Sequence, residues 1–251
     1  DLGMIHHELH AACTFYNSGF DTAAVLIVDG AGTFVPLGDS GEIGWELESI
    51  FSAAYPASFA TKYKHIGVRG PKTAYEKLAV PHSNRGKPDD IHDVIFSDHP
   101  GLTKCYEAMT DYCGFNFIEA GKAMGLAPYG KPNDSIPPIF LGKEARYMSN
   151  RNLFVPNYPN GAFVDRVMYP ALDTDNLEMK KDLAYAVQKA TEEQMVRLIL
   201  DAIERTGETN VCIAGGYGLN CVANYEYLAH LPEGINLYAV SYTHLTLPTI
   251  L

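Results

Sequence analysis

Several features that would assign this chain of 251 residues to a familiar class are missing from its sequence. The longest apolar run, residues 23–28, is far shorter than the ~20 residues that a membrane-spanning helix needs. Positive charge is scarce: 19 Lys and Arg stand against 30 Asp and Glu, and the net charge of −11 disfavours nucleic acid and anionic membranes as partners. Because 47% of the residues are hydrophobic, the chain can build a core, which excludes a disordered or collagen-like protein.

Cysteine is also sparse, and its spacing is uninformative. The five cysteines are odd in number and form no Cys-x-x-Cys motif: Cys13, Cys105, Cys113, Cys212 and Cys221. This argues against a disulfide scaffold and a thiolate zinc site and suits a reducing compartment, so we expect a cytoplasmic protein. A Gly-x-Ser-x-Gly elbow and a Walker loop are absent as well, so neither a serine hydrolase nor a P-loop enzyme is indicated.

Hydrophobic periodicity predicts alternating helices and strands. Helical spacing predicts a helix over 2–16, and the apolar run at 23–28 predicts a strand buried on both faces. The other expected elements are a strand at 33–37 returning as a hairpin, a loop over 81–101, a helix capped by Asp98 that runs to about Tyr112, a shorter helix at 117–127, an irregular stretch at 128–176, a long helix at 177–205 capped by Gly207, a strand at 210–214, a helix at 219–231 and a strand at 234–240. This order predicts an α/β protein.

The first candidate site is a cluster of histidines at residues 6–10. His6 and His10 are four residues apart, so on a helix both imidazoles point the same way and can bind one metal ion. His7 projects about 100° away and is expected to pack or to form hydrogen bonds. The spacing differs from the His-Glu-x-x-His of zinc proteases, and two surface or capping histidines would give the same pattern. Asp29 becomes a third ligand if the helix packs beside the strand.

Two glycine turns are candidate anion sites. Asp29-Gly30-Ala31-Gly32 follows a buried strand, at the end of the strand where α/β sheets bind ligands, and Gly215-Gly216 stands between a strand and a helix. A plain hairpin turn and a tight strand–helix connection would explain these two segments equally well. The small residues at 119–130 predict only a tightly packed helix end. Spacing alone therefore indicates an α/β protein that handles metal and phosphate.

In combination, these motifs resemble the O-carbamoyltransferases of antibiotic and nodulation-factor biosynthesis, which are relatives of the tRNA threonylcarbamoyl transferases. The resemblance spans residues 4 to about 240, and the helix with Gln188-Lys189-Ala190-Thr191-Glu192-Glu193 shares it. Four segments carry it, in the family's order: His6-His7-x-x-His10-Ala11-Ala12 with Phe15-Tyr16; Val28-Asp29-Gly30-x-Gly32; Lys122-x-Met124-Gly125-Leu126-Ala127-Pro128-Tyr129-Gly130; and Ala214-Gly215-Gly216-x-x-Leu219-Asn220.

The resemblance implies an incomplete α/β fold of the ribonuclease-H-like, actin and sugar-kinase (ASKHA) type, and a transferase activity. In that family a second domain makes carbamoyl-adenylate from carbamoyl phosphate and ATP, and the kinase-like domain transfers the carbamoyl group to a hydroxyl of a small molecule. The implied ligands of a divalent metal, with iron expected, are His6, His10 and Asp29. The implied nucleotide-binding residues are Asp29, Gly30, Gly32, Gly215, Gly216 and Asn220. Neither nucleic acid nor a membrane is an expected partner, and no residue is assigned as the general base.

The chain also departs from the family pattern. The family's remaining metal ligand is an aspartate in a Gly-Asp-x-Gly turn, whereas this chain has Ser241-Tyr242-Thr243-His244-Leu245 at that place. Residues 241–251 resemble a translated sequencing adaptor, and we expect them to be a non-native tail, exposed or poorly ordered. We therefore expect residues 1–240 to be a partial carbamoyltransferase N-terminal domain that is inactive by itself.

Three other functions remain open from the sequence. One is a sugar-kinase-like, ATP-binding protein of the same superfamily, although a kinase has no need of the paired histidines. Another is threonylcarbamoyl transfer to tRNA, which the negative charge disfavours. The third is a non-catalytic nucleotide-binding protein of the actin fold. A metal ion bound at His6 and His10 would favour carbamoyl transfer over the kinase and the non-catalytic protein.

Overall fold

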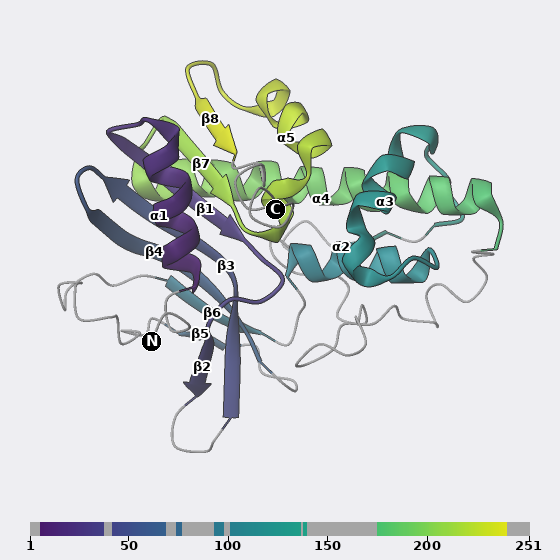
Figure 1. The fold of residues 1–251 in the computed structure, drawn as a ribbon, viewed down its shortest axis with the longest axis horizontal. Helices are drawn as coiled ribbons and strands as arrows, with labels where there is room; N and C mark the ends of the chain where they lie inside the picture. The colour runs from purple at the N-terminus through teal and green to yellow at the C-terminus, as the bar shows by residue number, and fades with distance from the viewer. Residues whose placement is uncertain are drawn as a thin grey trace, which may run out of the picture.

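The computed structural model describes residues 6–37, 42–68, 74–76, 93–97, 101–136, 138–139 and 175–239. Over these residues a mixed eight-stranded sheet carries helix α1 on one face and helices α2 and α4 on the other (Figure 1). The predicted α/β class is therefore confirmed. None of the helices that the structure describes combines the length and the apolar composition needed to cross a membrane.

The strand order in the sheet is β5-β6-β4-β3-β1-β7-β8, and β2 pairs with β3. The strands are β1 (Thr22–Val28), β2 (Phe34–Leu37), β3 (Glu42–Ala54), β4 (Ser58–Gly67), β5 (Ala74–Glu76), β6 (Asp93–Ser97), β7 (Asn210–Ala214) and β8 (Asn236–Ala239). Strand β1 is antiparallel to β3 and parallel to β7, which is itself parallel to β8. Because β1 and β7 run the same way, the turns that follow them, at Asp29 and Gly215, meet at one edge of the sheet.

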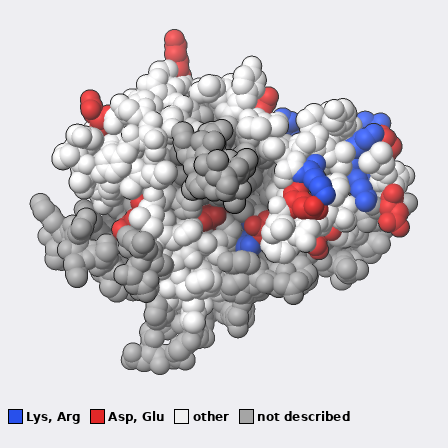
Figure 2. Space-filling model, in the orientation of Figure 1, with Lys and Arg blue, Asp and Glu red and all other residues white. Residues whose placement is uncertain are grey.

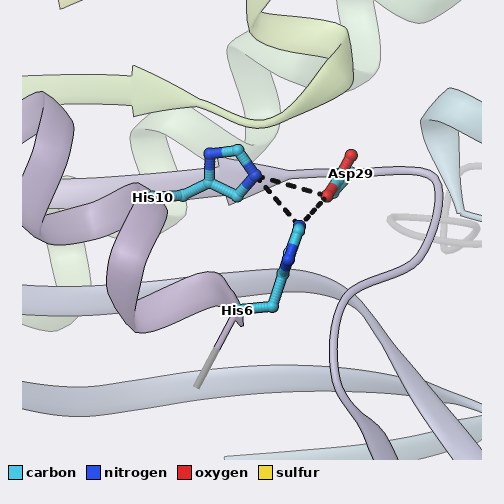
Figure 3. Close-up of side chains that lie close together, drawn as sticks. All are labelled: His6, His10 and Asp29. Atoms are coloured by element: carbon cyan, nitrogen blue, oxygen red, sulfur yellow. Dashed lines mark hydrogen bonds and ion pairs between the residues drawn. The ribbon is translucent and has the colours of Figure 1, made fainter. Parts of the chain in front are cut away.

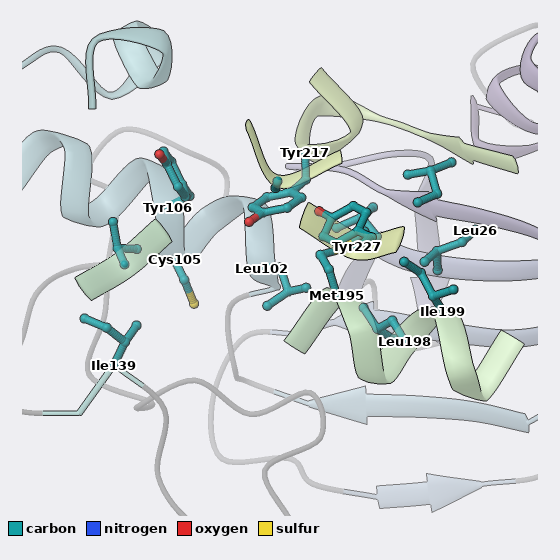
Figure 4. Close-up of a cluster of buried hydrophobic side chains, with 14 of the residues drawn as sticks. Leu26, Leu102, Cys105, Tyr106, Ile139, Met195, Leu198, Ile199, Tyr217 and Tyr227 are labelled. Carbon is teal, nitrogen blue, oxygen red and sulfur yellow. The ribbon is translucent and has the colours of Figure 1, made fainter. Parts of the chain in front are cut away.

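Alternate residues of β1 face the two helical layers, which explains why the whole strand is apolar. Odd-numbered residues pack with α1 and even-numbered residues with α2 and α4: Ala23, Val25 and Ile27 against Ala24, Leu26 and Val28. Figure 4 shows Leu26 in the second of these clusters together with Leu102 and Met195. The same alternation directs Asp29 toward α1 and Gly30 toward α2.

The helices are α1 (His6–Ser18), α2 (Leu102–Tyr112), α3 (Ala120–Leu126), α4 (Leu177–Thr206) and α5 (Cys221–Tyr227), with short 3-10 turns η3 (Phe117–Glu119), η4 (Ala127–Tyr129), η5 (Gly216–Leu219) and η6 (Leu228–His230). The predicted long helix is confirmed as α4, which Asn176 caps by accepting a hydrogen bond from the Glu178 N–H. It ends at Gly207, whose φ of 73° is the left-handed conformation that glycine adopts readily. Gly19, with φ 75°, ends α1 in the same way.

Several predictions were wrong in ways that tertiary contacts explain. Strand β2 pairs with β3, with Phe34 opposite Trp45, and not with β1 as a hairpin. Helix α2 starts at Leu102 and not after Asp98, because the Glu48 carboxylate of β3 accepts the Leu102 N–H at 2.9 Å. The predicted helices at 117–127 and 219–231 are found, but as the shorter helices α3 and α5, each flanked by 3-10 turns. Strands β3 and β4 were not predicted at all.

Other predictions meet the structure only in part or not at all. In the segment 119–130, a Cβ on Gly121 or Gly125 would meet nothing within 4 Å, so these two glycines do not mark tight packing. A Cβ on Gly130 would lie 2.1 Å from the Lys181 carbonyl oxygen, and the close approach to α4 is there. The predicted loop over 81–101 was wrong at residues 93–97, which form strand β6 between β4 and β5. The expectations for residues 2–5, for the rest of that loop at 81–92 and 98–100, for 140–174 and for the tail at 241–251 fall outside the described residues.

Candidate metal centre and the glycine turns beside it

Helix α1 presents its two histidines from its first turns toward the end of β1. His6 and His10 lie one helical turn apart, and Ala11 and Phe15 on the same helix are fully buried against the sheet. The backbone N–H of His6 donates a hydrogen bond to the Thr33 hydroxyl at 3.0 Å, which ties the start of the helix to the chain beyond β1. Packing along α1 and this bond at its start fix where the two imidazoles point.

Asp29 meets these histidines as the alternation along β1 requires. The His6 Nε2 atom lies 2.9 Å from Asp29 Oδ2, the His10 Nε2 atom lies 3.6 Å from it, and the two Nε2 atoms are 3.1 Å apart (Figure 3). The three side chains, called the triad below, each offer one ligand atom, and these atoms all lie within 4.8 Å of one another. The predicted convergence of His6, His10 and Asp29 is therefore found.

The glycine turns hold the Asp29 carboxylate from the other side. Asp29 Oδ1 accepts the backbone N–H of Gly30 at 2.8 Å and that of Gly216 at 3.0 Å. Gly215 has φ 91°, and a Cβ there would lie 2.3 Å from the Val28 carbonyl oxygen, so only glycine lets the turn after β7 approach β1 this closely. Both amides act on Oδ1, which leaves Oδ2 directed at the histidines.

The protonation of the triad follows from these contacts. Burial alone would raise the pKa of Asp29, but its contacts with His10 and His6, and the Gly216 N–H, hold that pKa well below its usual range. The hydrogen bond to Asp29 raises the pKa of His6. Asp29 is therefore a carboxylate that stays ionised beside two imidazoles.

The residues present fit a divalent metal ion. Two imidazole nitrogens and one carboxylate oxygen form a mixed N/O donor set that suits first-row transition metals. The spacings of 2.9, 3.1 and 3.6 Å match neighbouring ligands of an ion whose bonds are about 2.0–2.2 Å long, since such ligands are about 3.0–3.5 Å apart. The two Nε2 atoms also face each other closely, an arrangement in which a shared cation satisfies both lone pairs. Metal binding by these residues stays a prediction.

The structure also contains a second polar group, which sequence reasoning missed. His7, Glu46, Glu48, Ser49, Lys64 and His65 form what we call the sheet cluster. His7 Nδ1 pairs with the Ser49 hydroxyl at 2.7 Å, the Lys64 ammonium with Glu46, and His65 Nδ1 with Glu48 at 2.5 Å. All six residues are nearly or fully buried. The alternation of charged and apolar residues in β3 was the only signal for it. Such an alternation ordinarily indicates a sheet whose charged face is exposed to solvent.

Two of the expected nucleotide-binding residues are committed to the protein itself. The backbone N–H of Gly32 donates to the Glu46 carbonyl oxygen at 2.8 Å, and a Cβ on Gly32 would overlap His7 and Glu46. The buried side chain of Asn220 caps α5 through the Ala223 N–H and exchanges hydrogen bonds with Gln188. These contacts give Gly32 and Asn220 structural roles, and nucleotide binding by the turns stays a prediction.

The chain is similar to proteins that are about three times as long. It is 31% identical over 235 residues to an uncharacterized protein of Synechocystis, covering 89% of this chain and 31% of that protein. It is 26% identical to the nodulation protein NolO of Bradyrhizobium diazoefficiens and 25% identical to the nodulation protein NolNO of Sinorhizobium fredii, covering 90% and 89% of this chain but 33% and 26% of theirs. The family described as carbamoyltransferase N-terminus matches residues 2–232. The match includes the triad and also β7, α5 and the turn between them, whose Gly216 N–H bonds to Asp29. The chain therefore belongs to the carbamoyltransferase N-terminus family.

Proposed function

We propose that this chain takes part in the transfer of a carbamoyl group to a hydroxyl of a small molecule, with carbamoyl-adenylate, made from carbamoyl phosphate and ATP, as the donor. The observation that carries the proposal is the convergence of His6, His10 and Asp29 in a member of the carbamoyltransferase N-terminus family. The mixed sheet, with antiparallel β3 on one side of β1 and parallel β7 on the other, is compatible with a ribonuclease-H-like lobe of the actin and sugar-kinase type.

A divalent ion, with iron as the first candidate, would be held by Nε2 of His6, Nε2 of His10 and Oδ2 of Asp29. Such an ion would polarise a carbonyl or phosphate oxygen of the donor, because a carbamoyl carbon is a poor electrophile. The chain's own task is to keep these three atoms in place. The two amides on Asp29 Oδ1 and the Thr33 hydroxyl on the His6 N–H do this before any ligand arrives.

The glycine turns support donor binding by letting the backbone come close to this edge of the sheet. The amides of Gly30 and Gly216 already bond to Asp29, so a phosphate would lie beside that carboxylate and not in an empty ring of N–H groups. Negative charge next to Asp29 is tolerated only with a cation between them. Metal and phosphate binding are therefore coupled in this proposal.

Isotope labels distinguish carbamoyl transfer from the kinase alternative. The full-length protein is supplied with ATP, a divalent metal, a panel of sugars and glycosides, and carbamoyl phosphate labelled with carbon-14. Carbamoyl transfer moves the carbon-14 label to the sugar and converts ATP to AMP, whereas a kinase moves the terminal phosphate of ATP to the sugar and leaves ADP. The variant His10→Ala should abolish the transfer, and His230→Ala, which replaces a histidine remote from the triad, should not. Transfer of phosphate instead of the carbamoyl group would overturn the proposal.

A further inference from the structure

One face of α2 lies opposite the turn that follows β1. Thr103 and Lys104 both lie beside Glu107 on that face, because they precede it by four and three residues. A Cβ on Gly30 would lie 3.0 Å from Glu107 Oε1 and 3.4 Å from Lys104 Nζ. A Cβ on Gly216 would lie 3.5 Å from the Thr103 methyl group and 3.1 Å from Asp29 Oδ1. Since Asp29 faces α1 and Gly30 faces α2, two carboxylates reach the same turn from opposite sides.

Glu107 differs from the carboxylates of Asp29, Glu46 and Glu48 in how its two oxygens are engaged. Its Oε2 atom accepts a hydrogen bond from Lys104, whereas its Oε1 atom faces Gly30 and has no hydrogen-bond partner among the described residues. Its side chain is 17% exposed, so Glu107 is not sealed inside the protein. Both oxygens of Asp29 are engaged, and the carboxylates of Glu46 and Glu48 are sealed in the sheet cluster.

The charges around Glu107 adjust its basicity. Burial raises the pKa of Glu107, and the negative charge of Asp29 adds to the rise, while the Lys104 ammonium opposes it. Among the described residues, Lys104 on α2 and Asp29 at the end of β1 are the charged groups that act on this pKa. A carboxylate with a raised pKa is a stronger base than one in water, which suits general-base catalysis.

Resting on the proposed function, we propose that Glu107 is the general base of carbamoyl transfer and that Lys104 positions it. The proton of the acceptor hydroxyl passes to Glu107 Oε1 as the hydroxyl oxygen forms a bond to the carbamoyl carbon. The bond from that carbon to the phosphate oxygen of the donor breaks, and its electron pair leaves with AMP. The products are the carbamate ester, AMP and a protonated Glu107, which returns its proton to water.

Neighbouring groups are poorly placed for this role. Asp29 is held ionised by histidines and amides, and its pKa far below the usual range makes it a weak base. His6 and His10 direct their Nε2 atoms at Asp29 and would be occupied by the metal. His7 is completely buried, so no acceptor hydroxyl can reach it.

The test uses the full-length, metal-loaded protein with Glu107→Gln, Glu107→Ala and Lys104→Gln, and the carbon-14 assay described above. The matched control is Glu178→Gln, which removes a carboxylate from another Lys–Glu pair spaced by three residues, far from the triad on α4. We expect Glu107→Gln to lower kcat by at least about 100-fold, with metal affinity unchanged, and the control to change neither. Formate, a small carboxylate, should restore part of the activity of Glu107→Ala.

The pH profile separates a base from a structural residue. Wild-type kcat should fall on the acid side as Glu107 becomes protonated, and this fall should disappear in Glu107→Gln. In Lys104→Gln it should move to higher pH, because the ammonium no longer lowers the pKa of Glu107. A Glu107→Gln variant that keeps its kcat and acid limb, or an Ala variant that formate does not rescue, would overturn the inference while leaving carbamoyl transfer intact. Absence of transfer in the wild type with every acceptor would overturn the proposed function, and this inference with it.

Discussion

The triad and the sheet cluster are built from the same residue types and lie side by side, yet they differ in exposure and in the way their partners are arranged. The ring centroids of His6 and His7 are 6.1 Å apart. The side chains of His6 and His10 are 44% and 28% exposed, whereas those of Lys64, Glu46, His65 and Glu48 are all between 1% and 7% exposed. In the triad three donor atoms converge on one point, and in the sheet cluster each acid has its own base.

This difference separates ligand binding from fold stabilisation. Convergent donors on an accessible edge leave room for an ion, whereas the two buried acids of the sheet cluster, Glu46 and Glu48, are each already paired with a base. The sheet cluster is also connected to the triad by hydrogen bonds. Glu46 accepts the backbone N–H of Thr33, whose hydroxyl in turn accepts the N–H of His6. The buried Lys64–Glu46 pair therefore helps to hold His6, and with it the triad, in place.

The largest expected effect concerns metal binding, and it compares Asp29 of the triad with His7 of the sheet cluster. Asp29→Asn keeps the size of the side chain and removes the charge, and it should lower the affinity for Fe²⁺ or Mn²⁺ by at least about 100-fold in calorimetric titration. His7→Asn, one residue from His6 on the same helix, should change it less than threefold because His7 faces the sheet. Equal losses in the two variants would contradict the division between triad and sheet cluster.

The next effect concerns stability and belongs to the sheet cluster. Lys64→Met leaves Glu46 charged and buried without its cation, and it should lower the free energy of unfolding by about 3–5 kcal/mol in urea titrations. The double variant with Glu46→Gln should recover a part of that loss, because the uncompensated charge is gone. A single variant less than 1 kcal/mol below the wild type would show that water reaches Glu46.

The sequence predicted the triad and not the sheet cluster, for a physical reason. The spacing of His6 and His10, the apolar run of β1 and the alternation that carries on to Asp29 are local patterns, and local patterns fixed this geometry. Glu46 and Lys64 lie in different strands, and their burial depends on the pairing of β3 with β4. A sequence cannot distinguish a buried charge that has a distant partner from an exposed one.

The same reason explains the other successes and failures. Helix α4 and strand β7 were predicted because periodicity and the glycines at 207 and 215 mark their ends. The start of α2 was misplaced because its cap, Glu48, comes from β3. The contact between Glu107 and the Gly30 turn joins α2 to the end of β1 and has no local signature beyond the spacing of Lys104 and Glu107.

The next smaller effect is a loss of stability at acid pH that is due to His7 of the sheet cluster. Complete burial lowers the pKa of His7 from 6.5 to about 4, so between these values the unfolded chain takes up a proton that the folded chain does not. Stability from this residue is present above pH 6.5 and is lost as the pH falls, by up to about 3 kcal/mol at pH 4. Denaturant titrations from pH 7 to 4.5 should show this slope in the wild type, and His7→Asn should flatten it. His6, whose pKa is raised, contributes stability that is fully present below pH 6.5 and declines as the pH rises above that value, so it does not add to the loss at acid pH.

The smallest expected effect on stability comes from an exposed ion pair. Lys181 and Glu178 on α4 lie 2.6 Å apart, but 71% of the Glu178 side chain is exposed to water. Water screens such a pair, and holding two long side chains together costs entropy, so Lys181→Met should change the free energy of unfolding by less than about 1 kcal/mol. The difference should shrink further in 1 M salt, whereas the loss in Lys64→Met should persist, because salt does not enter the sheet cluster. If the loss caused by Lys64→Met also shrank in salt, the Lys64–Glu46 pair would be accessible to solvent like the pair on α4. The distinction between the buried sheet cluster and the exposed ion pairs would then be wrong.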